Sequence, residues 1–237
     1  MSDVNHAPVV EPKVFASLQN LESRFHDAEQ ELLRKQVELY KPLYSERDPL
    51  LDQIPKFWVT VIEEKEELEE LFNLEDSKLI DHLKSLQVSR EDADPRNFTI
   101  SMAFEENDFL DSSHLVLSKS FTHNDDGDQE YTSKPVEIKW KKDITTQPDG
   151  GRPSFFSFFA WTGGEEDVFL QGEEVALILA DEVYPDALKT WTDAQNVDSE
   201  DDSDMGSVDI ESGDEDDAEE DDGEQQDGPQ KKKARTS

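Results

Sequence analysis

The sequence predicts an α+β fold: a long N-terminal helix, a four-stranded antiparallel sheet flanked by helices, and a disordered acidic C-terminal tail. Three observations support this prediction. Apolar residues near the N-terminus follow helical spacing, those in the middle of the chain alternate with polar residues, and every aromatic residue lies before residue 197. The chain has 237 residues, which suits one medium domain with appendages.

Residues 13–47 are predicted to form one helix of about 50 Å, at ~1.5 Å per residue. Its apolar residues follow alternating steps of three and four: Leu18, Leu21, Phe25, Ala28, Leu32 and Leu39. Lys35, between the last two, fills the one seam position that is not apolar. A heptad seam of this kind normally faces a second helix, so we expect a homodimer. A helix packed only on its own domain is the alternative. Pro42 removes an amide donor and should kink or end the helix near Lys41.

The middle of the chain is predicted to form strands, because its apolar residues recur with a period of two. Strands are expected at 98–105, 115–121 and 136–141, and a fourth at 83–91. Asp76 is expected to cap a short helix before them. Helical signals return at 155–159 and at 173–184. The adjacent phenylalanines of 155–159 favour a core segment over a ligand pocket.

The charge of the chain is strongly negative and unevenly distributed. Fifty-nine acidic and 23 basic side chains give a net charge of −36. Residues 197–237 hold 17 acids and 4 bases, a net of −13, and leave −23 for residues 1–196. The tail cannot bury enough apolar surface to offset chain entropy, so we expect disorder. Its basic end, Lys231, Lys232, Lys233 and Arg235, indicates a nuclear import signal and a nuclear protein that can shuttle with the cytoplasm. Ser199 and Ser212 match acidophilic kinase sites only weakly.

Several classes of function find no support in the sequence. Cysteine is absent, no apolar segment approaches a membrane span, and we expect no signal peptide. The five histidines are scattered, so no catalytic, metal or cofactor site is expected. The segment 124–128 suits a hairpin loop better than a calcium loop. The charge disfavours membrane and strong direct nucleic-acid binding, and it favours a basic nuclear partner.

Six short segments, in order within residues 14–195, resemble segments of one protein family: KPLYSER (41–47), IPKFWVT (54–60), VLSKSF (116–121), EIKWK (137–141), SFFSFF (154–159) and DEVYP (181–185). The family is that of the nucleosome assembly proteins, and the resemblance is strongest to its SET (template-activating factor) branch. Residues 147–152 and the tail are shorter than in that branch. This leaves open the fungal relative named for vacuolar sorting.

The resemblance implies a non-enzymatic histone chaperone built from four regions. These are a disordered arm (1–13), a dimerisation helix (14–52) that continues through Pro42, an "earmuff" histone-binding domain (53–196) on the four-stranded sheet, and the acidic tail (197–237). The implied cargo is core histones, with histones three and four favoured. The acids expected to bind them are Glu165, Glu166, Asp167, Glu173, Glu174, Asp181 and Glu182. The alternative is a regulatory subunit that activates a histone acetyltransferase or inhibits a phosphatase.

Overall fold

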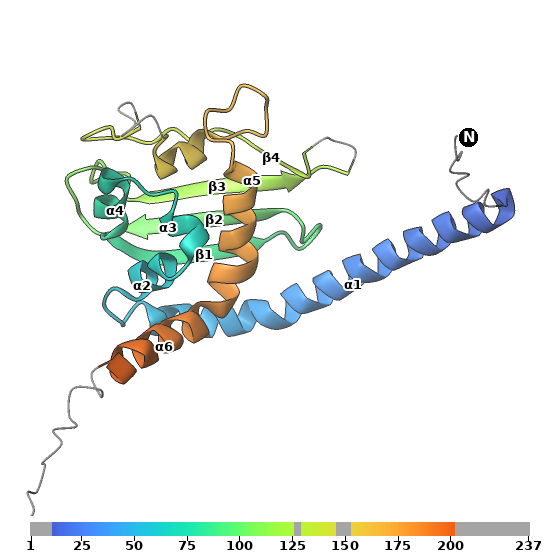
Figure 1. Cartoon of the computed structure of the whole chain (residues 1–237), viewed down its shortest axis with the longest axis horizontal. Coiled ribbons are helices and arrows are strands. Elements are labelled where there is room, and N and C mark those ends of the chain that lie inside the picture. Colours follow the sequence, from blue (N-terminus) through green and yellow to red (C-terminus); the bar gives the residue numbers. More distant parts are fainter. Residues whose placement is uncertain (1–10, 126–128, 146–152, 202–237) are drawn as a thin grey trace, which may run out of the picture.

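A computed structural model describes residues 11–125, 129–145 and 153–201, with side chains as far as residue 196. It confirms the predicted class: one long helix, a four-stranded antiparallel sheet and helices that cover one face of that sheet (Figure 1). In chain order the elements are α1 (Pro12–Leu51), α2 (Phe57–Glu63), α3 (Glu66–Glu69), α4 (Leu74–Ile80), β1 (Leu83–Arg90), β2 (Phe98–Phe104), β3 (Val116–His123), β4 (Tyr131–Ser133), the 3-10 helix η2 (Phe155–Ala160), α5 (Gly172–Leu177), the π-helical turn η3 (Ile178–Val183) and α6 (Tyr184–Asp201).

The long helix α1 runs without a break through Pro42 and Pro49, as the resemblance implied for Pro42. Its N-terminal half projects away from the rest of the molecule (Figure 1). Pro42 is exposed, so the carbonyl group that loses its amide partner can be hydrated instead. None of the helices in the described segments has the length and apolarity to cross a membrane.

The sheet has the order β1-β2-β3-β4, and every neighbouring pair is antiparallel. One face is apolar and buried, because Leu86, Met102 and Leu117 lie side by side in register. The opposite face is polar, and hydroxyl pairs bridge β2 and β3 there, such as Ser101 with Ser118 at 2.8 Å. This clean division between two faces is typical of an antiparallel sheet covered on one side.

The prediction of a strand at 136–141 is wrong, because the fourth strand of the sheet is β4. Residues 134–139 form no strand, and their backbone groups bond to η2 and to the loop before β3 rather than to a ladder. Val136 N donates to Phe159 O at 2.8 Å, and Trp140 makes an isolated bridge with Leu110. The alternation correctly predicted which side chains pack on the core. It cannot reveal whether a neighbouring strand is present to pair with.

A buried carboxylate joins the short helices to the aromatic core. This carboxylate belongs to Asp76, which was predicted to cap a short helix but has another role in it. The side chain of Asn73 caps α4, while Asp76 is the third helical residue and completes the capping box. The Asp76 carboxylate also accepts from Phe155 N at 2.9 Å and from the Ser154 hydroxyl. It thereby fixes η2, whose phenylalanines are fully buried, as expected for a core segment.

Lys119 is a buried cation on the apolar face of the sheet. Its ammonium donates to the carbonyl oxygens of Lys134 (3.1 Å), Phe159 (3.1 Å) and Trp161 (2.7 Å). These bonds hold the end of η2 and the segment after β4 against β3. Burial lowers the pKa of Lys119 to about 8.

Several expectations concern residues outside the described segments. These are the N-terminal arm up to residue 10, positions 126–128 of the expected hairpin loop, residues 147–152, and the tail from residue 202 with Ser212 and the basic run. The side chain of Ser199 also lies outside the description. α6 extends to Asp201, and the boundary of the domain at residue 196 stays a prediction.

We predict that Lys119→Ala lowers the free energy of unfolding by about 3 kcal/mol, because three carbonyl groups lose a charged donor and the shortened side chain leaves a void. Ser120→Ala, on the exposed face of the same strand, should change it by about 0.5 kcal/mol or less. Urea unfolding measures both values.

The effect of Lys119→Ala should also depend on pH. The folded-state pKa of about 8 lies below the ordinary value of 10.5, so between these values the unfolded chain binds more protons. The wild type should therefore gain stability relative to the variant as pH rises from 8 to 10. An alanine variant as stable as the wild type at both pH values would contradict this role.

Candidate functional site

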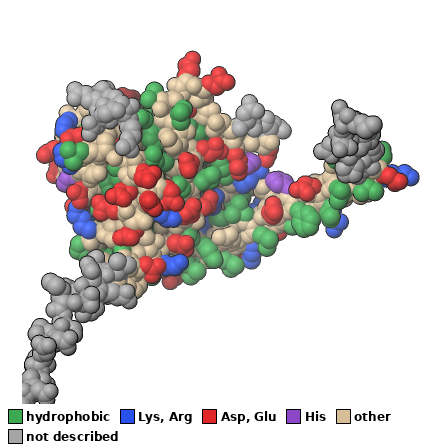
Figure 2. All heavy atoms as spheres, viewed as in Figure 1, with side chains coloured by type: hydrophobic (Ala, Val, Ile, Leu, Met, Phe, Trp, Pro, Cys, Tyr) green, Lys and Arg blue, Asp and Glu red, His purple; other side chains and the backbone are tan. Residues whose placement is uncertain are grey.

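Five carboxylates from α3, α5 and η3 line one hollow on the helix-covered side of the earmuff domain. We call it the acidic hollow; it has a volume of about 650 Å³. Its lining residues are Glu67, Gln129, Leu170, Gln171, Glu173, Glu174, Leu177, Ile178, Asp181 and Glu182. Figure 2 shows Asp and Glu side chains gathered over the helices on this side of the molecule. Four of the seven acids predicted to bind histones therefore lie together.

The spacing of residues along α5 and η3 explains this grouping. Glu174, Ile178 and Asp181 follow one another at steps of four and three, which places them on one face of the helix. Gly172 starts the helix directly against Trp161, where a Cβ atom would lie 2.2 Å from the indole Cγ. Only glycine permits this approach, so it sets where the acidic face begins.

Three of these acids are already engaged within the domain. Asp181 forms an ion pair with Arg90 of β1, and Glu182 forms one with Lys65 at 2.6 Å. Glu173 accepts a hydrogen bond from the backbone amide of Tyr131 at 3.0 Å. The contacts of Asp181 and Glu173 fix α5 and η3 on the sheet, and that of Glu182 links η3 to the N-cap of α3. They also reduce the charge that Asp181 and Glu182 can offer to a ligand.

Glu67 and Glu174 are the acids of the hollow most available to a partner. Both are exposed, and among the described residues neither carboxylate has a hydrogen bond or an ion pair. Glu67 was not among the acids predicted to bind histones, although the acidic stretch around it is visible in the sequence. Only the packing of α3 beside α5 places it in the hollow.

The other three predicted acids occupy the turn before α5. Glu165 and Glu166 are exposed, outside the acidic hollow. Asp167 points inward, and its carboxylate accepts from the backbone amides of Thr162 (2.9 Å), Gly163 (2.8 Å) and Gly164 (3.0 Å). Gly163 has a positive φ of 87°, which glycine adopts without strain. Asp167 therefore serves to hold this turn.

The seam of α1 is exposed along its length. The exposed fractions are 54% for Leu18, 43% for Leu21, 59% for Phe25, 71% for Leu32 and 55% for Leu39. Ala28 is exposed as well. Val14 extends the seam at the same helical spacing, and the exposed Leu43 and Leu50 lie one residue beyond the positions where that spacing places Pro42 and Pro49. Hydrophobic side chains are visible along α1 in Figure 2. An exposed apolar stripe of this kind, interrupted at Lys35, normally marks an interaction surface.

A buried cluster that we did not predict connects α1 to the earmuff domain. We call it the α1 joint; it consists of Tyr44, Arg47, Asp48 and Tyr184. The Arg47 guanidinium lies 4.5 Å and 4.4 Å from the ring centroids of Tyr44 and Tyr184. Asp48 accepts hydrogen bonds from Arg47 at 3.0 Å and from the Tyr184 hydroxyl at 2.8 Å. Burial and this last bond raise the pKa of Tyr184.

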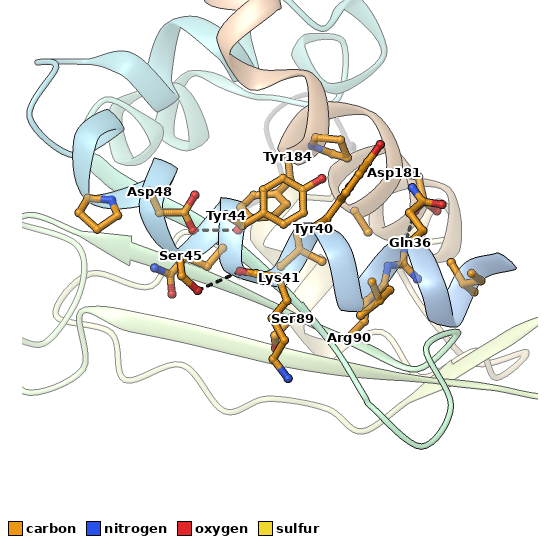
Figure 3. A pocket seen from close by; sticks show the side chains of 17 residues that line it. Gln36, Tyr40, Lys41, Tyr44, Ser45, Asp48, Ser89, Arg90, Asp181 and Tyr184 are labelled. Carbon is orange, nitrogen blue, oxygen red and sulfur yellow. Dashed lines mark hydrogen bonds and ion pairs between the residues drawn. The ribbon is translucent and has the colours of Figure 1, made fainter. Parts of the chain in front are cut away.

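A cavity of about 620 Å³ lies beside the joint, between α1, β1 and η3 (Figure 3). Tyr40, Tyr44 and Tyr184 form its aromatic part, while Lys41 and Arg90 contribute cations. Within the described part of the chain, no three His, Cys, Asp or Glu residues are arranged to hold a metal ion.

Comparison with known proteins identifies the family. Residues 48–148 match the Nucleosome assembly protein (NAP) family. A nucleosome assembly protein of Schizosaccharomyces pombe is 36% identical over 213 residues, which cover 84% of this chain and 86% of the relative. Vacuolar protein sorting-associated protein 75 of Saccharomyces cerevisiae is 28% identical over 231 residues, covering 78% of this chain and 87% of that protein. The chain belongs to the nucleosome assembly protein family.

Solved structures agree with this assignment. The crystal structure of Ccp1 superimposes with a TM-score of 0.69 at 36% identity, covering 77% of this chain and 96% of that one. The crystal structure of Vps75 gives 0.68 at 25% identity, covering 78% of this chain and all of that one. The long helix with a sheet-based domain is thus the architecture of the family.

Proposed function

We propose that this protein is a histone chaperone that binds core histones, favours histones three and four, and promotes nucleosome assembly. The observation that carries this proposal is the acidic hollow, where Glu67 and Glu174 are exposed beside three further carboxylates. Membership of the nucleosome assembly family and a net charge of −36 support it. One relative of known structure, Vps75, is itself described as a histone chaperone.

The proposed mechanism is shielding of charge without catalysis. Free histones carry dense positive charge that binds DNA nonspecifically, and a fixed acidic surface can cover part of it. Carboxylates held on α3 and α5 can match a fixed pattern of cations, so they would set specificity. The charges of the tail would mainly accelerate encounter, and salt should screen them with a Debye length of ~8 Å at physiological ionic strength.

Location and further partners extend the proposal. The basic run from Lys231 to Arg235, outside the described residues, would direct the protein to the nucleus. The same acidic surface could instead serve a regulatory subunit that activates a histone acetyltransferase or inhibits a phosphatase. Activity assays with either enzyme would detect this alternative. The proposed form of the protein is a homodimer in which the seams of two α1 helices pair.

The test of histone binding is a titration of the purified complex of histones three and four at two salt concentrations. We expect Glu67→Gln combined with Glu174→Gln to weaken binding about fivefold, since exposed charge contacts are worth ~0.2–1 kcal/mol each. Glu105→Gln combined with Glu137→Gln changes the net charge by the same amount at exposed positions outside the hollow. This control should weaken histone binding less than twofold.

Deletion of residues 202–237 completes this comparison. The deletion should make histone affinity less dependent on salt. At moderate salt it should weaken binding less than the double substitution in the hollow does. If tail deletion abolishes binding while the hollow variant binds normally, the tail is the main site and the acidic hollow is not.

We predict that the wild type has the mass of a dimer by light scattering. Leu21→Glu combined with Phe25→Glu should give a monomer, because pairing would bring four like charges into an apolar seam. Asn20→Glu combined with Ser23→Glu adds the same charge at exposed positions of α1 away from the seam, and it should leave the mass unchanged. A monomeric wild type would refute the pairing of α1.

A further inference from the structure

Two of the most exposed large hydrophobic side chains among the described residues lie beside the acidic hollow. Val168 is 77% exposed and Leu170 is 76% exposed, both in the segment before α5. Leu170 also lines the hollow together with Leu177 and Ile178. The hollow therefore has an apolar part as well as carboxylates.

These two side chains are held in a fixed position by the segment that carries them. Phe169, between them, is 2% exposed and packs against Phe155 and Phe158 with centroid distances of 6.5 Å and 6.4 Å. Asp167 binds three successive backbone amides on one side, and Gly172 abuts Trp161 on the other. With Phe169 anchored inward, its two neighbours face outward. Such a segment presents apolar groups without a large loss of conformational entropy on binding.

Acidic residues surround this apolar site. Glu165 and Glu166 lie before it along the chain, and Glu173 and Glu174 follow it. Glu67 adds charge from α3. Carboxylates repel an acidic partner and an anionic membrane. A polycation without apolar groups would leave Val168 and Leu170 without contacts. Charge complementarity thus favours a partner that combines cations with an aliphatic face.

We propose that Val168 and Leu170 form an apolar anchor for an amphipathic protein segment rich in lysine and arginine, which docks with its aliphatic side chains on this anchor and its cations on the acidic hollow. This inference rests on the proposed function and specifies the chemistry of its partner. Part of the binding energy would then come from apolar contacts, which salt does not screen. The rest would come from charge contacts, which salt weakens.

The test uses the full-length protein and two synthetic helical peptides. One is lysine-rich with a leucine face, and the other has each leucine replaced by serine. We expect the wild type to bind the leucine peptide about tenfold more tightly at equal salt, as burial of an aliphatic side chain predicts. Val168→Ser combined with Leu170→Ser should remove this preference. Val116→Ser combined with Leu74→Ser, exposed residues outside the hollow, should retain it.

The outcomes separate this inference from the proposed function. A leucine preference that is absent in the wild type, or that survives in the Val168→Ser, Leu170→Ser variant, overturns the anchor while histone binding by the acidic hollow can still hold. If the preference behaves as expected but the wild type fails to bind histones three and four, the anchor stands and the proposed function fails. Circular dichroism of each variant checks that the fold is unchanged.

Discussion

The contact of Arg47 with the rings of Tyr44 and Tyr184, which also touch each other, fixes the long helix on the earmuff domain. The placement of the apolar seam and of the acidic hollow depends on it. The Arg47 and Asp48 side chains are only 17% and 12% exposed, so removal of one leaves the other charge buried without its counter-charge, typically at a cost of ~3–5 kcal/mol. The Lys41–Asp92 ion pair, at 2.8 Å, also links α1 to this domain, but its side chains are 59% and 79% exposed. Such pairs contribute ~0–1 kcal/mol.

This joint relates the two surfaces on which the proposed function depends. It orients α1 so that the apolar seam faces away from the domain, while Tyr184 lies just after the π-helical turn that carries Asp181 and Glu182. If α1 pairs with a second copy, the joint sets how far apart the two acidic hollows lie. A cargo that bridges both hollows would then be selected by its dimensions as well as by its charge.

The sequence predicted the layers of the fold better than the details of the site. Periodicity reveals which face of an element is apolar, so β1 to β3 were correctly located, while the pairing of the α1 seam stays a prediction. It does not reveal pairing partners, which is why residues 136–141 were mistaken for a strand. Four of the predicted acids lie together in one hollow, but the Asp167 carboxylate binds backbone amides of the turn before it. Glu67 and the α1 joint were missed because they depend on contacts between residues far apart in the sequence.

The most direct test of the joint is the distance between α1 and the earmuff domain in solution. Spin labels on cysteines introduced at Asn20 and Ser120, both exposed, would be measured by double electron–electron resonance after mixing with excess unlabelled protein. The chain has no native cysteine to interfere. We predict one narrow distance distribution for the wild type and a broad one after Arg47→Ala. An equally narrow distribution in the variant would show that other contacts fix the helix and would contradict this account.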